Sequence, residues 1–198
     1  NGQYLQTWFE CLPEEVLDNT APAGTIPLLL ANHGGGDDPM QFLDEFGLLP
    51  IAEAERVALV VPYHSDITSS VNIFMPELVR YMLETYPALD ASRVYTTGYS
   101  MGGIASLASV YGGPDLFAAC VSMAGFLLYQ PTEEDTANLN KYGMPMLGVI
   151  SNYDDYWYDW GVGIAQRFQD MFTPFMIANG FEPIQHDFAT YPMSGFKG

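Results

Sequence analysis

Basic residues are scarce in this chain of 198 residues, which carries six Lys and Arg against 24 Asp and Glu, for a formal net charge of −18. Such a charge argues against nucleic acid and against anionic membranes as partners, because both repel an acidic surface. The acidic residues are scattered rather than gathered in blocks, which is typical of a solvated surface. The composition is therefore compatible with an enzyme that acts on neutral small molecules.

Long apolar runs and cysteines are also few. No run approaches the roughly 20 residues of a membrane span, and residues 26–30 have only the length of a strand. The two cysteines are Cys11 and Cys120, and neither belongs to a spacing typical of a metal site. Cys120 lies in an apolar run, which predicts a buried thiol, while a bridge to Cys11 stays open as an alternative. We expect no cofactor and no metal.

The length and the 48% of hydrophobic residues predict a single domain with a substantial core. The chain starts at Asn1 rather than at a methionine, so we expect a processed or trimmed form, and secretion is favoured. Strand-like runs alternate with helix-like runs. The predicted strands are 4–9, 26–31, 57–61, 93–97, 118–124, 145–150 and 184–191. The predicted helices are 51–55, 75–86, 104–111 and 163–178.

This alternation predicts an α/β fold with a mostly parallel central sheet and helices on both faces. The continuous apolar strands agree, because such strands are buried on both sides. Pro62 is expected to end the strand 57–61, and the polar stretch 130–142 is expected to be an excursion above the sheet.

The most informative motif is Gly-Tyr-Ser-Met-Gly-Gly at 98–103, which fits the Gly-x-Ser-x-Gly nucleophile elbow. The β-branched run before it and the small apolar run after it supply the strand–turn–helix context that the motif requires. Side chains at Gly98 or Gly102 would collide with the neighbouring strand and helix. We therefore predict Ser100 as a nucleophile, with Tyr99 beside it as a substrate-binding residue.

A second motif, Asn-His-Gly-Gly-Gly at 32–36, follows the strand 26–31 directly. A glycine-rich turn leaves backbone N–H groups open to a substrate. The N–H of Met101 and that of Gly35 or Gly36 are predicted to form an oxyanion hole, which binds the negative oxygen of a tetrahedral intermediate.

Together the two motifs resemble the α/β-hydrolase superfamily, and within it the esterases related to polyhydroxybutyrate depolymerases and feruloyl esterases. The run 90–100 resembles the segment that precedes the nucleophile in those enzymes. The resemblance implies an α/β-hydrolase fold, an acyl-enzyme at Ser100 and a triad in the order Ser, acid, His.

In those enzymes the acid follows the next-but-one strand after the nucleophile, which here places it in the loop 151–155. Laid over the His-Gly-x-x-Asp pattern of the family, Asp155 takes the place of the acid. Asp154 is one residue out of register, and Asp159 is a more distant third choice. The alternative for each is a solvated loop carboxylate.

The chain has three histidines, namely His33, His64 and His186. His33 is predicted to hold its loop through a ring hydrogen bond, with a metal site shared with Asp37 and Asp38 as the less favoured alternative. His64 precedes the nucleophile and is out of the family order. His186 has the right order but lies inside a predicted strand, so the base is either His186 or a histidine beyond Gly198. The second reading is favoured, because no closing helix follows the last predicted strand.

Aromatic side chains crowd the loop of the predicted acid, and Tyr156 and Trp157 among them are predicted to bind substrate. The alternative is that they pack this loop onto its neighbours. The sequence as a whole predicts a serine esterase that acts on a small-molecule or carbohydrate-linked ester. Two alternatives stay open: a peptidase of the same fold, and a catalytically silent hydrolase-fold module that binds carbohydrate.

Overall fold

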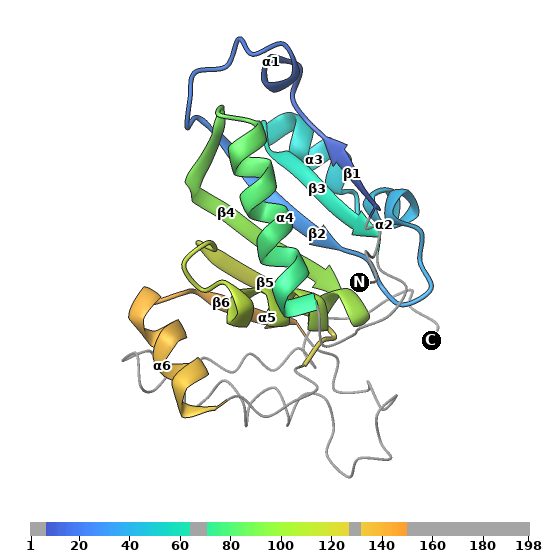
Figure 1. The fold of residues 1–198 in the computed structure, drawn as a ribbon. Coiled ribbons are helices and arrows are strands. Elements are labelled where there is room, and N and C mark those ends of the chain that lie inside the picture. The colour runs from blue at the N-terminus through green and yellow to red at the C-terminus, as the bar shows by residue number, and fades with distance from the viewer. Residues whose placement is uncertain (1–6, 64–70, 127–131, 150–198) are drawn as a thin grey trace, which may run out of the picture.

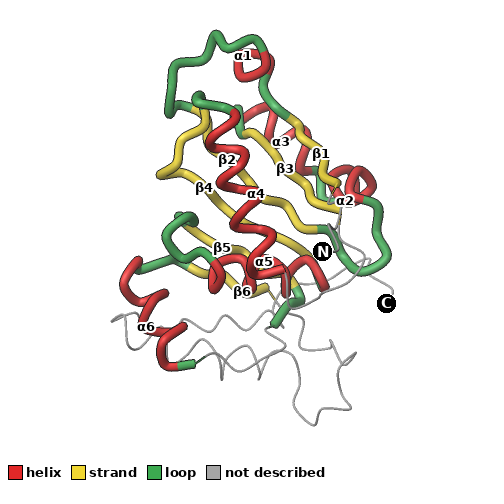
Figure 2. Tube along the Cα trace, viewed as in Figure 1, coloured by secondary structure: helices red, strands yellow, loops and turns green. Residues whose placement is uncertain are grey.

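The computed structural model describes residues 7–63, 71–126 and 132–149 (Figures 1 and 2). The strands are β1 (Thr7–Cys11), β2 (Ile26–Asn32), β3 (Ala58–Tyr63), β4 (Leu89–Tyr99), β5 (Ala119–Met123) and β6 (Met146–Val149). The helices are α1 (Glu14–Leu17), α2 (Pro39–Glu45), α3 (Leu48–Glu55), α4 (Val71–Thr85), α5 (Met101–Gly112) and α6 (Glu133–Tyr142). None of the helices in this part of the chain is long and apolar enough to cross a bilayer.

The described strands form one six-stranded sheet in the order β1-β3-β2-β4-β5-β6. β1 pairs with β3 in antiparallel fashion, whereas every other neighbouring pair is parallel. The predicted mostly parallel α/β sheet is therefore confirmed. Because β2 and β4 are parallel neighbours, their carboxyl ends meet at one edge of the sheet, where an α/β fold binds its ligands.

Alternate residues of β2 face the two helical layers. Leu28 and Leu30 belong to an apolar cluster with residues of α4 and α5. Ala31 belongs to a second cluster, with Phe42 of α2 and Ala52 of α3. Figure 1 shows α4 across one face of the sheet, with α3 beyond the opposite face. The central strands are thus buried on both sides, as their continuous apolar runs predicted.

β3 continues through Pro62, so the prediction that this proline ends the strand is wrong. Proline lacks the N–H that a ladder needs. β3 pairs with β2 only as far as Val60, whereas its antiparallel pairing with β1 continues to Trp8↔Pro62 and Thr7↔Tyr63. The strand has a neighbour on one side only at Pro62, and proline is tolerated there as it is at a sheet edge.

The polar excursion 130–142 contains a helix that the pattern did not predict, because α6 occupies most of it. Thr132 and Asp135 form a capping box at its start: Asp135 N donates to Thr132 Oγ1 at 3.1 Å, and Thr132 N donates to Asp135 Oδ2 at 2.8 Å. Leu139 is buried against the core, while most of the helix is polar. One buried leucine gives little apolar periodicity, so the cap is the signal that identifies this helix.

The pattern also missed α1 and α2 and placed the starts of α3, α4 and α5 three or four residues too late. Asp38 caps α2, since its Oδ1 accepts from Met40 N at 2.9 Å and from Gln41 N at 3.3 Å, and Pro39 stands at the first helical position. The helix predicted at 51–55 begins at Leu48, and that predicted at 75–86 begins at Val71. The edges predicted for the described strands are right to within four residues.

The two cysteines are free, so the open question of a bridge is decided. Cys120 is buried, and this burial raises the pKa of its thiol to about 12. Cys11 is half-buried, and its pKa is raised for the same reason. Both thiols are therefore protonated at neutral pH.

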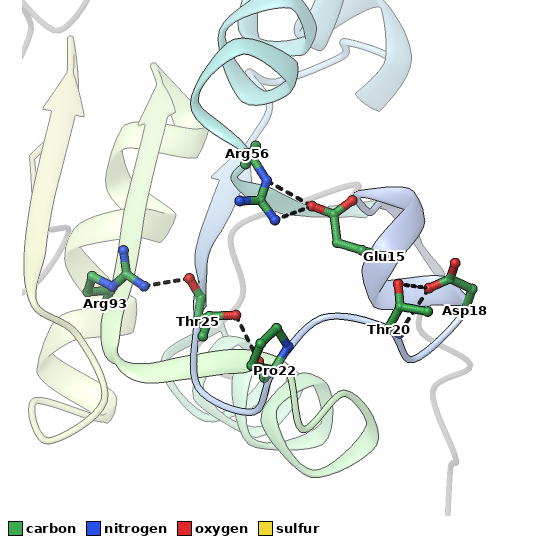
Figure 3. Close-up of polar contacts among 7 residues, drawn as sticks. All are labelled: Glu15, Asp18, Thr20, Pro22, Thr25, Arg56 and Arg93. Atoms are coloured by element: carbon green, nitrogen blue, oxygen red, sulfur yellow. Dashed lines mark hydrogen bonds and ion pairs between the residues drawn. The ribbon is translucent and has the colours of Figure 1, made fainter.

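Polar contacts hold the end of the sheet that lies opposite the carboxyl ends of β2 and β4 (Figure 3). The guanidinium of Arg56, just after α3, pairs with Glu15 of α1. Arg93 of β4 donates from Nη2 to the carbonyl of Thr25 at 2.6 Å and from Nε to Asp90 Oδ2 at 2.6 Å. These contacts fasten α1 and the entry into β2 to neighbouring elements, although exposed ion pairs contribute little individually.

Asp90→Asn is expected to lower the melting temperature at pH 7 by an amount that shrinks in acid. The hydroxyl of Ser92 and the guanidinium of Arg93 donate to the Asp90 carboxylate and lower its pKa to about 2. A carboxylate whose pKa is lowered by folding contributes stability that is present above its unfolded pKa and is lost as the pH falls through the folded value. The difference between the two proteins should therefore shrink between about pH 4 and pH 2.

Melting curves over that pH range, followed by circular dichroism, provide the measurement. Glu84→Gln changes an exposed carboxylate of α4 and serves as the control, with little expected change at pH 7. A difference between wild type and Asp90→Asn that stays constant down to pH 2 would contradict the role given to these hydrogen bonds.

Candidate active site

Ser100 stands between the last residue of β4 and the first residue of α5, with φ 54° and ψ −116°. A positive φ in a residue other than glycine costs about 1–3 kcal/mol, so the surrounding structure must hold it. Here Ser100 N donates to the carbonyl of Met123 at 2.8 Å, and Ser100 O accepts from Ile104 N at 3.1 Å. A strand, a strained serine and a helix in immediate succession form the geometry of a nucleophile elbow.

The glycines on either side of Ser100 are required by close backbone contacts. A Cβ on Gly102 would lie 2.0 Å from the carbonyl oxygen of Asn32, at the end of β2. A Cβ on Gly98 would lie 2.3 Å from the carbonyl oxygen of Gly102 and 2.7 Å from that of Asn32. The collisions predicted from the sequence are confirmed, and they show that the first turn of α5 rests directly on β2 and β4.

The glycine-rich turn after β2 reaches the start of α5. A Cβ on Gly35 would lie 3.5 Å from Met101 Sδ and 3.7 Å from Met101 Cβ, so the two residues are neighbours. Gly36 has φ +84°, a conformation that favours glycine. Met101 is the first residue of α5, where an N–H has no intrahelical acceptor. The structure thus places Gly35 beside Met101, the residue that follows Ser100, while the oxyanion hole itself stays a prediction.

His33 is buried at the start of the same turn. Its Nδ1 lies 2.7 Å from the carbonyl oxygen of Gly34, and its ring centroid lies 5.7 Å from that of Tyr63. Because a carbonyl only accepts, Nδ1 carries the hydrogen of this bond. The predicted structural hydrogen bond of His33 is confirmed. Among the described residues, no three His, Cys, Asp or Glu side chains converge as metal ligands would.

Tyr99 directly precedes Ser100 at the end of β4. It is 43% exposed, and its ring centroid lies 5.5 Å from that of Phe46, at the end of α2. Phe46 in turn packs on Phe42, with 4.8 Å between the centroids. Sequence reasoning missed Phe46, although its i, i+4 spacing from Phe42 after the Asp-Pro start of α2 is a helical signal. Tyr99 and Phe46 together present partly exposed aromatic surface at the carboxyl edge of the sheet.

The remaining predicted site residues lie outside the described residues, and they stay predictions. These are the acid candidates Asp154, Asp155 and Asp159, the base candidates His64 and His186, and the substrate-binding candidates Tyr156 and Trp157.

Residues 75–182, which span more than half of the chain and include the elbow, match the model of the Prolyl oligopeptidase family. The chain belongs to the prolyl oligopeptidase family. The predicted membership of the α/β-hydrolase superfamily is thereby confirmed. No curated protein matches the sequence.

Solved structures show the same fold at low sequence identity. The chain is similar to S-formylglutathione hydrolase FrmB from Staphylococcus aureus, with 18% identity, a TM-score of 0.61 and coverage of 92% of this chain and 84% of that one. A ferulic acid esterase matches with 12% identity, a TM-score of 0.55 and coverage of 88% and 92%. An acetyl xylan esterase from Aspergillus awamori matches with 18% identity, a TM-score of 0.50 and coverage of 62% and 48%.

The chain thus spans about half of the acetyl xylan esterase, and 56% of a thermostable esterase that it also resembles. Similarity at these identities demonstrates the shared α/β-hydrolase fold.

Proposed function

We propose that the protein is a serine hydrolase that cleaves carboxylic esters, with Ser100 as its nucleophile. The strained backbone of Ser100, between β4 and α5, is the observation that carries the proposal. Such strain persists only where the surrounding structure enforces it, and it clusters at functional sites. The similar solved structures named above include proteins described as esterases and hydrolases, which favours ester cleavage.

In the proposed reaction the hydroxyl oxygen of Ser100 attacks the ester carbonyl while a histidine accepts its proton. The N–H of Met101 and that of Gly35 or Gly36 donate to the carbonyl oxygen as it becomes negative. The tetrahedral intermediate expels the alcohol, which takes the proton from the histidine. Water then attacks the acyl–Ser100 ester by the same route and releases the carboxylic acid product.

We assign the acidic member of the triad, which orients the histidine, to Asp155. This residue follows β6, the second strand along the chain after the nucleophile strand. The base is either His186 or a histidine that follows Gly198 in a longer chain. His186→Ala distinguishes the two: in the first case the 198-residue chain turns over ester and the variant does not, whereas in the second case turnover requires residues after Gly198 and persists in His186→Ala made in that longer chain.

The proposed substrate is a neutral small-molecule or carbohydrate-linked ester. The net charge of −18 disfavours anionic substrates, and the exposed Tyr99 ring with Phe46 offers aromatic surface beside the nucleophile. Tyr156 and Trp157 are proposed to extend this surface. Two of the similar structures, an acetyl xylan esterase and a ferulic acid esterase, agree with such a substrate class.

Peptide hydrolysis is the second candidate, and the match to the prolyl oligopeptidase family favours it. The same nucleophile and oxyanion hole serve esters and amides, so the elbow does not separate the two.

The test compares a p-nitrophenyl ester with the p-nitroanilide of the same acyl group, including a prolyl pair, each corrected for its uncatalysed hydrolysis. The proposal expects a larger rate enhancement for the esters, and for neutral acyl groups over anionic ones. A larger enhancement for the prolyl anilide would establish the peptidase instead. Saccharide binding without turnover of either substrate would establish the silent binding module.

A further inference from the structure

Asn32 is a buried amide at the end of an otherwise apolar strand. Its side chain has no exposed surface. Nδ2 lies 3.0 Å from Ser106 Oγ of α5, 3.3 Å from Thr96 Oγ1 and 3.3 Å from the carbonyl oxygen of Thr97, both on β4. One side chain of β2 therefore contacts both the nucleophile strand and the helix that follows the nucleophile.

The contact with Ser106 continues to the first turn of α5. Ser106 Oγ donates to the carbonyl oxygen of Gly102 at 2.9 Å, and Gly102 packs on the backbone of Asn32. Met101, whose N–H is proposed to bind the oxyanion, directly precedes Gly102. Asn32 also opens the turn that carries Gly35. The amide thus ties together the two segments that must hold their N–H groups at a fixed separation.

A buried serine of α5 does not need an amide partner. Ser109 donates to the carbonyl of Ala105 at 2.7 Å and makes no hydrogen bond with Asn32. Asn32 Oδ1 is buried and has no hydrogen-bond partner among the described residues. A buried acceptor without a partner is destabilising, whereas an apolar residue would continue the pattern of β2. Residues that lower the stability of the fold in this way are expected at functional sites.

We propose that Asn32 is a positioning residue, which acts through Ser106 to hold the Gly35 turn and the Met101 N–H in register for the oxyanion. The inference rests on the proposed ester hydrolysis at Ser100. Because catalysis is sensitive to displacements of about 1 Å, loss of this link is expected to reduce kcat by roughly 10- to 100-fold while KM changes little. A group that served folding alone would change stability and leave the kinetic constants of the folded enzyme in place.

The first experiment compares Ser106→Ala with Ser109→Ala. Both variants remove a buried hydroxyl that donates to the carbonyl four residues earlier on the same helix, so similar changes in melting temperature are expected. Only Ser106 contacts Asn32. We expect kcat for p-nitrophenyl acetate to fall in Ser106→Ala and to stay within about twofold of wild type in Ser109→Ala. Equal kcat losses in the two variants would overturn the proposal.

The second experiment uses Asn32→Leu, which keeps the number of side-chain heavy atoms and removes both the unpaired acceptor and the donor to Ser106. We expect kcat to fall as in Ser106→Ala, and the double variant to fall no further than the worse of the two single ones. Wild-type kcat in Asn32→Leu would overturn the inference alone. Absence of ester turnover in the wild-type protein would overturn the proposed function and this inference together.

Discussion

Ser100→Ala is expected to reduce kcat for ester hydrolysis by about 10⁶-fold, the loss typical of removing a serine nucleophile. The hydroxyl oxygen is the atom that forms the acyl-enzyme, so no neighbouring group replaces it. The fold should survive, because alanine at φ 54° carries the same backbone strain as serine and the backbone bonds to Met123 and Ile104 remain. Turnover of p-nitrophenyl acetate and the melting temperature are the two measurements.

A fluorophosphonate probe, followed by intact mass, tests the same assignment without a chosen substrate. The wild-type protein should gain one adduct and Ser100→Ala none. Ser92→Ala removes an exposed serine near the start of β4 and serves as the control, with labelling and turnover unchanged. Equal labelling of wild type and Ser100→Ala would show that another residue is the nucleophile.

The elbow could be predicted from the sequence because its determinants are local. Gly98, Ser100 and Gly102 lie within five residues, and the collision of a Gly98 Cβ with the Gly102 carbonyl lies inside the motif, although the collisions with Asn32 also need β2 in place. The pairing of β2 with β4 could likewise be expected, since parallel α/β sheets place such motifs at one edge. Short-range geometry therefore carries most of the information about the nucleophile.

Asn32 and Phe46 could not be assigned in the same way. The partners of the Asn32 amide lie 64, 65 and 74 residues away along the chain, so its contacts exist only once β2, β4 and α5 have packed. Phe46 reaches Tyr99 only through the path of α2 across the sheet. In the sequence alone, Asn32 is a polar residue that follows an apolar run, and Phe46 is an ordinary apolar residue.

The misassigned elements show a different weakness of prediction from pattern. In each case a strong feature of the composition outweighed the signal that identifies the element. The capping box of Thr132 and Asp135 marks the start of α6, but the polar composition of that stretch favoured an excursion above the sheet. Pro62 resembles a strand end unless it is known that β3 has lost its second neighbour at that point. Periodicity measures burial, so it fails where an element is barely buried or lies at the end of a ladder.

Gly102→Ala is expected to be the most damaging glycine substitution of the site, with a loss of about 4 kcal/mol or more of the free energy of unfolding. Its Cβ would lie 2.0 Å from the oxygen and 2.5 Å from the carbon of the Asn32 carbonyl, and 2.6 Å from the oxygen of His33. All three atoms are backbone, so no side-chain rotation relieves the overlap. Urea unfolding gives the change in stability, and ester turnover gives the change in activity.

Gly143→Ala is the matched control, because it adds the same methyl group where no heavy atom lies within 4 Å. Gly143 has φ +58°, so its substitution costs only the left-handed conformation, about 1–2 kcal/mol, and should leave kcat unchanged. In Gly102→Ala, by contrast, α5 must move away from β2, which separates the Met101 N–H from the Gly35 turn. Any fraction of Gly102→Ala that folds should therefore be inactive. Equal losses of stability in the two variants, with turnover intact in both, would show that the first turn of α5 does not rest on β2 as described.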